Sequence, residues 1–144
     1  MSAVVASTRP WTVGRTVARG TLIGTGLALL GAFAVYGFGR LTTPFRVVSG
    51  WSPEGAEVSA VEIAVTVVVA MAAGGLLLAA LARWRAEPLR PWIGTVAAVA
   101  VLSAVPLWHL DLDTRSKVAL SLMHLLTGVA AVAGQVLARR YPAP

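Results

Sequence analysis

The sequence contains no cysteine, which excludes disulfides, thiolate metal sites and thiol oxidoreductase chemistry. Charge is also scarce, because only 12 of the 144 residues are Lys or Arg and only 6 are Asp or Glu. No phosphate-binding loop, nucleophile elbow or HExxH pattern occurs. The enzyme classes that these residues and motifs mark are therefore excluded from the start.

Apolar residues dominate what remains. They make up 57% of the chain, and the mean hydropathy of +0.77 is too high for a soluble domain of this length. A net charge of +6 favours nucleic-acid binding in a soluble protein, but here the basic residues form short clusters between apolar runs. We therefore predict an integral membrane protein whose surroundings are the lipid bilayer, with no nucleic-acid partner.

Four apolar runs are long enough to cross a bilayer, whose hydrocarbon core of about 30 Å needs about 20 helical residues. The first could also be a signal peptide, but it is longer than a usual signal-peptide core. Pro106 lacks a backbone donor and should kink or loosen the third run before Trp108 and His109. We predict an all-α bundle, a single domain over 1–144, with transmembrane helices at about 20–39, 58–82, 91–110 and 117–138.

The connections differ in length and composition. Residues 40–57 contain Pro44, Gly50, Pro53 and Gly55, so we predict a loop there. A short basic connector, residues 83–90, follows the second run. The fourth run follows a polar turn in which Asp113 or Thr114 is the expected N-cap.

Lys and Arg are distributed unequally between the two sides of the predicted bundle. One side holds eight: Arg9, Arg15, Arg19, Arg83, Arg85, Arg90, Arg139 and Arg140. The other holds four: Arg40, Arg46, Arg115 and Lys117. The positive-inside rule then predicts a plasma-membrane protein with both termini in the cytoplasm. The five tryptophans fall near the span ends, as an aromatic belt at the two interfaces predicts.

Small residues recur at a spacing of four in the first three runs, at Gly20, Gly24 and Ala28, at Ala70 and Gly74, and at Gly94 and Ala98, and Gly128 supplies a small residue in the fourth. Such spacing permits close contact between helices in lipid. It is compatible with a homo-oligomer interface or with contacts inside the bundle. We favour contacts inside the bundle, because Ala and Gly are abundant throughout the chain.

The fourth run has one polar or small face. On a helix with 100° per residue, that face is a narrow stripe made of Lys117, Ser121, His124, Gly128, Ala131 and Gln135. His124 is the only ionisable group in the middle of this run. Ionisable residues well inside a span usually face protein or a water-filled cavity, so His124 is the first candidate for a functional residue.

Acids and histidines gather on the outer side, where we expect Glu62, His109 and His124 to line one outward-facing vestibule. An imidazole and a carboxylate that share a pocket can exchange a proton near neutral pH, which makes these three the catalytic candidates. Secondary polar candidates are Asp111, Asp113, Ser121 and Gln135. The structural alternatives are an interfacial Glu62 paired with arginine, an interfacial His109, and hydrogen bonds from His124 and Gln135 that only join helices. The spacing of His and carboxylates predicts no metal site and no cofactor.

The four spans, the short basic second connector and the stretch DLDTRSKVALSLMH, which ends at His124, resemble uncharacterised small four-helix integral membrane proteins of actinobacteria. That family implies a fold but no activity. Small multidrug transporters also have four short helices, but their membrane glutamate lies in the first span. Here the first span has no glutamate and Glu62 begins the second, which argues against proton-coupled drug export.

The sequence thus favours a small multipass membrane protein with a structural or accessory role. Other membrane proteins, a second copy of the chain or a lipophilic small molecule are its expected partners. One alternative is a membrane-embedded acid/base enzyme, an isomerase or cyclase, in which His124 and Glu62 exchange protons with a lipophilic substrate. The other is a small proton-coupled transporter, although no internal inverted repeat relates the two halves.

Overall fold

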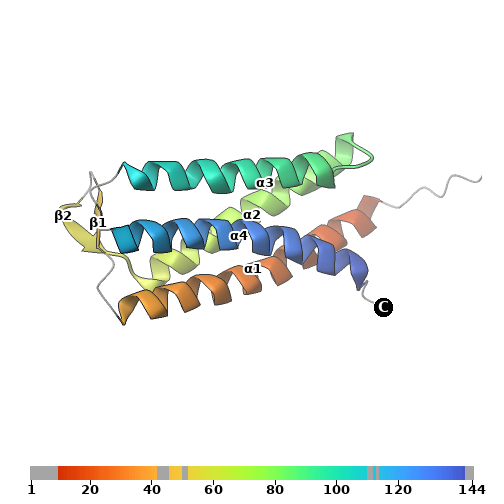
Figure 1. The fold of residues 1–144 in the computed structure, drawn as a ribbon. Coiled ribbons are helices and arrows are strands. Elements are labelled where there is room, and N and C mark those ends of the chain that lie inside the picture. The colour runs from red at the N-terminus through yellow and green to blue at the C-terminus, as the bar shows by residue number, and fades with distance from the viewer. Residues whose placement is uncertain (1–9, 42–45, 50–51, 110–111, 113, 142–144) are drawn as a thin grey trace, which may run out of the picture.

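Four helices lie side by side in one bundle (Figure 1). The computed structural model describes residues 10–41, 46–49, 52–109, 112 and 114–141, and the side chains among them except those of 10–12, 46–49 and 52–57. The helices are α1 (Pro10–Arg40), α2 (Ala60–Trp84), α3 (Leu89–Ala104) and α4 (Thr114–Arg140). All four predicted helices are therefore confirmed, and each is long and apolar enough to cross a membrane when the short helix after α3 is included.

Most helices extend beyond the predicted spans, but α2 begins at Ala60, two residues later than predicted. The extensions of α1, α2 and α4 include charged residues such as Arg19, Arg83 and Arg139. α1 begins earliest relative to its prediction, at Pro10, which suits a first helical turn. α3 ends at Ala104 and continues as the 3₁₀-helix η1 (Val105–Trp108), so the loosening predicted at Pro106 is confirmed.

Part of the predicted 40–57 loop is a β-hairpin, and the loop prediction is wrong there. Strand β1 (Arg46–Ser49) pairs antiparallel with β2 (Ser52–Glu57), with Arg46 opposite Glu57 and Ser49 opposite Ser52. The signal was the β-branched pair Val47 and Val48, which the turn-formers around them concealed. Pro53 is compatible with this hairpin because each strand has an open edge, where no ladder donor is needed.

The closest helix contact joins α1 and α4, and small residues make it. Gly20 and Gly24 of α1 face Gly134 of α4 so closely that a methyl group on Gly134 would collide with the backbone of both. Ala28 and Ala32 continue the contact along α1, each with only 1% of its surface exposed. In lipid, where apolar surface brings helices together only weakly, such backbone approach is the main source of packing energy.

The prediction that the small residues pack inside the bundle is confirmed for Gly20, Gly24 and Gly128 but is wrong for Gly74 and Gly94. Space is open beside Gly74 and Gly94, because a methyl group on either would meet no atom of the described residues within 4 Å. The same four-residue spacing thus occurs on a packed face of α1 and on open faces of α2 and α3.

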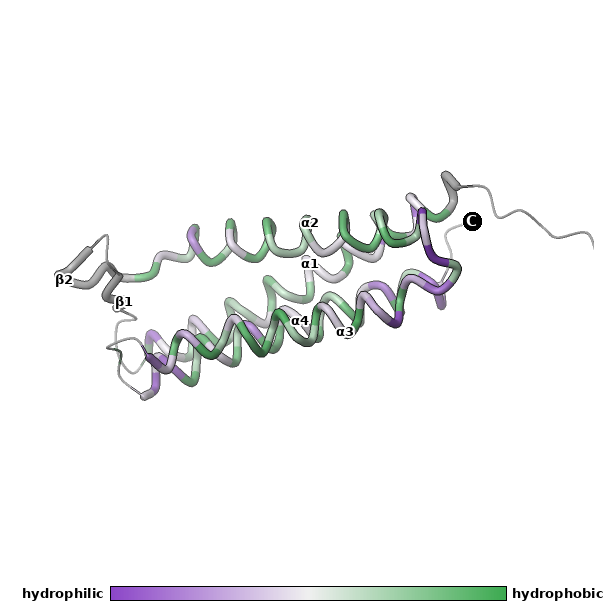
Figure 2. Tube along the Cα trace, turned by 90° about the horizontal axis from the view of Figure 1, so that it is seen from above, coloured by the Kyte–Doolittle hydropathy of each residue, from purple (hydrophilic) through white to green (hydrophobic). Residues whose placement is uncertain are grey.

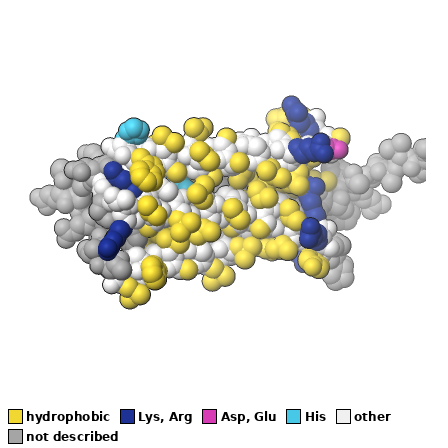
Figure 3. Space-filling model, viewed as in Figure 1, with side chains coloured by type: hydrophobic (Ala, Val, Ile, Leu, Met, Phe, Trp, Pro, Cys, Tyr) yellow, Lys and Arg dark blue, Asp and Glu magenta, His cyan; other side chains and the backbone are white. Residues whose placement is uncertain are grey.

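Charged and apolar side chains separate along the bundle. A wide band of hydrophobic side chains covers the middle, and Lys and Arg gather toward its two ends (Figure 3). Leu22, Leu30 and Leu76 each expose more than 70% of their surface in this band. An exposed apolar band between two charged ends is the surface expected of a protein surrounded by lipid.

Candidate functional site

An open groove of about 540 Å³ runs between α2 and α3, with α4 at its base. We call it the lateral groove. α2 packs mainly on α1, and α3 mainly on α4, so α2 and α3 meet only weakly. Figure 2 shows them close at the end with their connector and apart at the other. Its polar lining is Thr21, Glu62, Thr66, Trp92, Thr95, Ser103, His124, Thr127 and Gln135, and the other lining residues are apolar or glycine.

Trp92 closes the groove at the connector end. It exposes 1% of its surface and donates a 2.8 Å hydrogen bond from Nε1 to the carbonyl oxygen of Gly74, which joins α3 to α2. The aromatic-belt prediction is therefore wrong for Trp92, whereas Trp84 and Trp108 are 80% and 53% exposed, as belt residues should be. Trp92 is a groove-lining residue that the sequence pattern did not indicate.

His124 lines the groove from α4 and is half-buried. Its Nδ1 lies 2.8 Å from the carbonyl oxygen of Leu120. A carbonyl only accepts, so Nδ1 is the donor of this hydrogen bond, and in that tautomer Nε2 is an acceptor. Among the residues that the structure describes, none donates a hydrogen bond to Nε2.

Glu62 lines the end of the groove opposite the α2–α3 connector, and its carboxylate is held by a capping box at the start of α2. Oε2 accepts hydrogen bonds from the Ser59 backbone N–H at 2.7 Å and from the Ser59 hydroxyl at 3.0 Å, while that hydroxyl caps the Glu62 N–H. Glu62 is exposed. It lies in the first turn of α2, whereas His124 lies ten residues into α4.

The other candidates lie in different surroundings. His109 is exposed just after η1 and does not line the groove. Ser121 lies outside the groove lining, and its hydroxyl oxygen is buried without a hydrogen-bond partner among the described residues. Asp111 and Asp113 fall outside the described residues. The structure therefore brings Glu62 and His124 to one groove without His109, and a catalytic role for any of them stays a prediction.

Gln135 joins α4 to α1, as the structural alternative predicted. It exposes 2% of its surface, and its Nε2 donates to the Val17 carbonyl at 3.1 Å and to the Thr21 hydroxyl at 3.3 Å. Oε1 lies close to where a methyl group on Gly20 would be, at 2.5 Å. The glycine therefore leaves room for the amide at the helix crossing.

The comparison with known proteins adds a family. The chain matches a family of unknown function, DUF6069, over residues 12–142. It belongs to this family. No curated protein and no solved structure matches it. The predicted relationship to an uncharacterised family is confirmed, and DUF6069 brings no activity that could be assigned to the lateral groove.

Within this DUF6069 chain, several groove residues gave no signal in the sequence. Thr66, Thr95 and Ser103 each stand alone in an apolar run, where a single hydroxyl is unremarkable. Thr127 did carry a signal, because it comes three residues after His124 and therefore lies on the same side of α4. The groove itself depends on how α2 and α3 diverge, which the pattern of a single helix does not determine.

Proposed function

We propose that this chain is an accessory multipass protein of the plasma membrane, without catalysis of its own, that binds a lipophilic molecule in the lateral groove. The observation that carries the proposal is the groove of about 540 Å³. Sites for small molecules typically measure about 300–1,000 Å³ and combine apolar walls with few polar groups. The lateral groove has both properties.

The position of the groove selects the route of entry. Thr66, Ala70 and Ala73 line its α2 wall and are exposed on the side of the bundle, within the helix span that is long enough to cross a membrane. A molecule dissolved in the acyl chains reaches this wall directly. An ion or a sugar would first have to leave water, at a cost of several kcal/mol for each unpaired polar group.

The enzyme and transporter alternatives lack a comparable observation. The carboxylate of Glu62 is bound by Ser59, and no hydrogen bond or ion pair joins it to His124 within the described part of the chain. We therefore place binding ahead of proton exchange.

Blocking the groove tests the proposal. Ala70 lines the groove, whereas Ala72 is exposed on the same helix but outside the lining. We expect a long-chain alcohol carrying a photoreactive diazirine to label groove residues in the native protein. Ala70→Leu should reduce this labelling about tenfold, because overpacking costs about 1–3 kcal/mol.

Ala72→Leu is the matched control, since it adds the same side chain to α2 without filling the groove. Labelling sites are read by mass spectrometry of the full-length protein in nanodiscs. Labelling that is spread evenly around the bundle, or that falls equally in both variants, contradicts the proposal.

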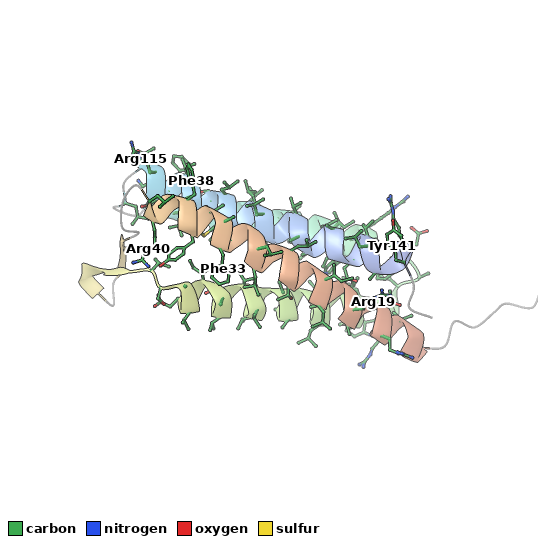
Figure 4. All side chains as sticks on the ribbon, turned by 90° about the horizontal axis from the view of Figure 1, so that it is seen from below. Arg19, Phe33, Phe38, Arg40, Arg115 and Tyr141 are labelled. Carbon is green, nitrogen blue, oxygen red and sulfur yellow. The ribbon has the colours of Figure 1, made fainter. Side chains whose placement is uncertain are left out.

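The orientation belongs to the same proposal, with both termini cytoplasmic. Among side chains that the structure describes, seven arginines lie toward one end of the bundle, namely Arg15, Arg19, Arg83, Arg85, Arg90, Arg139 and Arg140. Three cations lie toward the opposite end, namely Arg40, Arg115 and Lys117. Figure 4 shows Arg19 with Tyr141 at the first end and Arg40 with Arg115 at the second. The positive-inside rule supports a cytoplasmic location for the end with seven.

The absence of cysteine makes this orientation simple to measure. Leu41 is 83% exposed at the end of α1, and the Glu87 side chain is 77% exposed in the α2–α3 connector. We expect a membrane-impermeant maleimide to label Leu41→Cys in intact cells and Glu87→Cys only after permeabilisation. Leu30→Cys, in the apolar band, should react in neither condition. The opposite pattern for the first two variants would reverse the orientation.

A further inference from the structure

We infer that the lateral groove selects lipophilic molecules that donate a hydrogen bond, namely long-chain alcohols or phenols, over ketones, esters and ethers of the same shape. This inference rests on the proposed function and adds the chemical class of the ligand. It follows from the hydrogen-bonding groups that line the groove. Nearly all of their donors are already used, while acceptors remain.

The nitrogen donors of the lining are all occupied. Trp92 Nε1 donates to the Gly74 carbonyl at 2.8 Å, and His124 Nδ1 donates to the Leu120 carbonyl at 2.8 Å. Gln135 Nε2 donates to a backbone carbonyl and a hydroxyl of α1 at 3.1 and 3.3 Å. None of these three side chains has an N–H group left for a ligand, apart from any hydrogen bond to a residue outside the described part of the chain.

The hydroxyl donors are used in the same way. Thr95 donates to the Pro91 carbonyl at 3.0 Å, Ser103 to the Ala100 carbonyl at 3.2 Å and Thr127 to the Met123 carbonyl at 2.8 Å. Thr21 likewise donates to its own helix, at 2.9 Å. Such bonds to the preceding turn leave only oxygen lone pairs for another partner. Thr66 is the single lining hydroxyl without a described bond, and it lies one turn further along α2 than Glu62.

His124 Nε2 is a groove acceptor without a described donor. His124 lies seven residues, or about 10 Å, along α4 from Lys117, which is inside an apolar core about 30 Å thick. At that depth little water competes, and an acceptor left without a donor is costly. A ligand hydroxyl supplies the missing donor, whereas a carbonyl or ether oxygen would place one acceptor against another.

The length of the groove suits an extended acyl chain. Its α2 wall runs from Glu62 to Leu77, which is about 22 Å along the helix axis.

The test compares oleyl alcohol with oleyl methyl ether, which differ in the donor and little in shape. Both compete with the photoreactive alcohol for the full-length protein in nanodiscs, and the ¹⁵N resonance of His124 Nε2 is followed by NMR. We expect the alcohol to compete about tenfold more strongly than the ether, the factor typical of one net hydrogen bond. The alcohol alone should shift the Nε2 resonance.

Two variants of His124 test whether its Nε2 acceptor causes the preference for the alcohol over the ether. His124→Phe keeps an aromatic ring but removes the acceptor, so the alcohol and ether should compete equally. His124→Gln retains an acceptor at the end of the side chain and should keep part of the preference. If the native protein binds both ligands equally, or the preference survives in His124→Phe, the inference is overturned while groove binding stands. If neither ligand competes and labelling is not confined to the groove, the proposed function falls as well.

Discussion

Gly134→Ala is expected to destabilise the bundle by about 3 kcal/mol or more, although it adds a single methyl group. That methyl group would collide with the Gly20 carbonyl oxygen and with the backbone nitrogen and Cα of Gly24. Overpacking usually costs about 1–3 kcal/mol because side chains move aside. Backbone atoms of a packed helix cannot do so, and α1 and α4 would have to separate along their closest contact.

Gly24→Ala should have a smaller but still large effect. Its methyl group would meet the Met71 methyl at 2.7 Å, which can rotate away, and the Ala130 carbonyl at 2.9 Å, which cannot. Gly26, two residues along the same helix, has open space beside it. Gly26→Ala should leave the stability unchanged or raise it by up to about 1 kcal/mol, because Ala favours helix over Gly.

The three variants are compared by thermal unfolding in detergent, followed by far-ultraviolet circular dichroism. The expected order of melting temperature is Gly26→Ala at or above the native protein, then Gly24→Ala, then Gly134→Ala. If Gly134→Ala has the same melting temperature as Gly26→Ala, the α1–α4 contact is looser than described. The role assigned to glycine in this bundle would then be wrong.

Composition and periodicity were sufficient to predict the four helices, because a bilayer demands about 20 apolar residues in each span and tolerates few other backbone structures. They were also sufficient to predict that Gln135 joins two helices, since a buried amide in lipid needs a partner. The hairpin at β1 and β2 was not predictable in the same way. Its β-branched residues are few, and their pairing joins residues up to eleven positions apart.

The site was harder to predict for a geometric reason. The polar stripe on α4 correctly placed His124 and Gln135 on one face, but their environments depend on neighbouring helices. Gln135 meets α1, where glycine permits close approach, whereas His124 lies beside the space left between α2 and α3. Trp92 shows the same limit, because its position after Pro91 is typical of an interfacial residue and only the tertiary fold buries it.

Trp92→Ala is expected to have the second large effect on stability, about 3–5 kcal/mol, the usual cost of truncating a fully buried tryptophan. The side chain is 1% exposed, and its Nε1 bond to the Gly74 carbonyl joins α3 to α2 at the closed end of the groove. Trp92→Phe keeps most of the packing and loses the donor. We therefore expect it to cost about 1–2 kcal/mol, as for one hydrogen bond with some lost volume.

The matched control is Trp84→Ala, which removes a tryptophan that is 80% exposed at the end of α2. It should leave the melting temperature near that of the native protein. Because Trp92 holds α2 and α3 together at one end only, Trp92→Ala should also widen the distance distribution between spin labels at Leu76→Cys on α2 and Val101→Cys on α3. A native distance distribution together with a native melting temperature would mean that the α1–α4 contact alone holds the bundle, and that the width of the lateral groove is set by something other than Trp92.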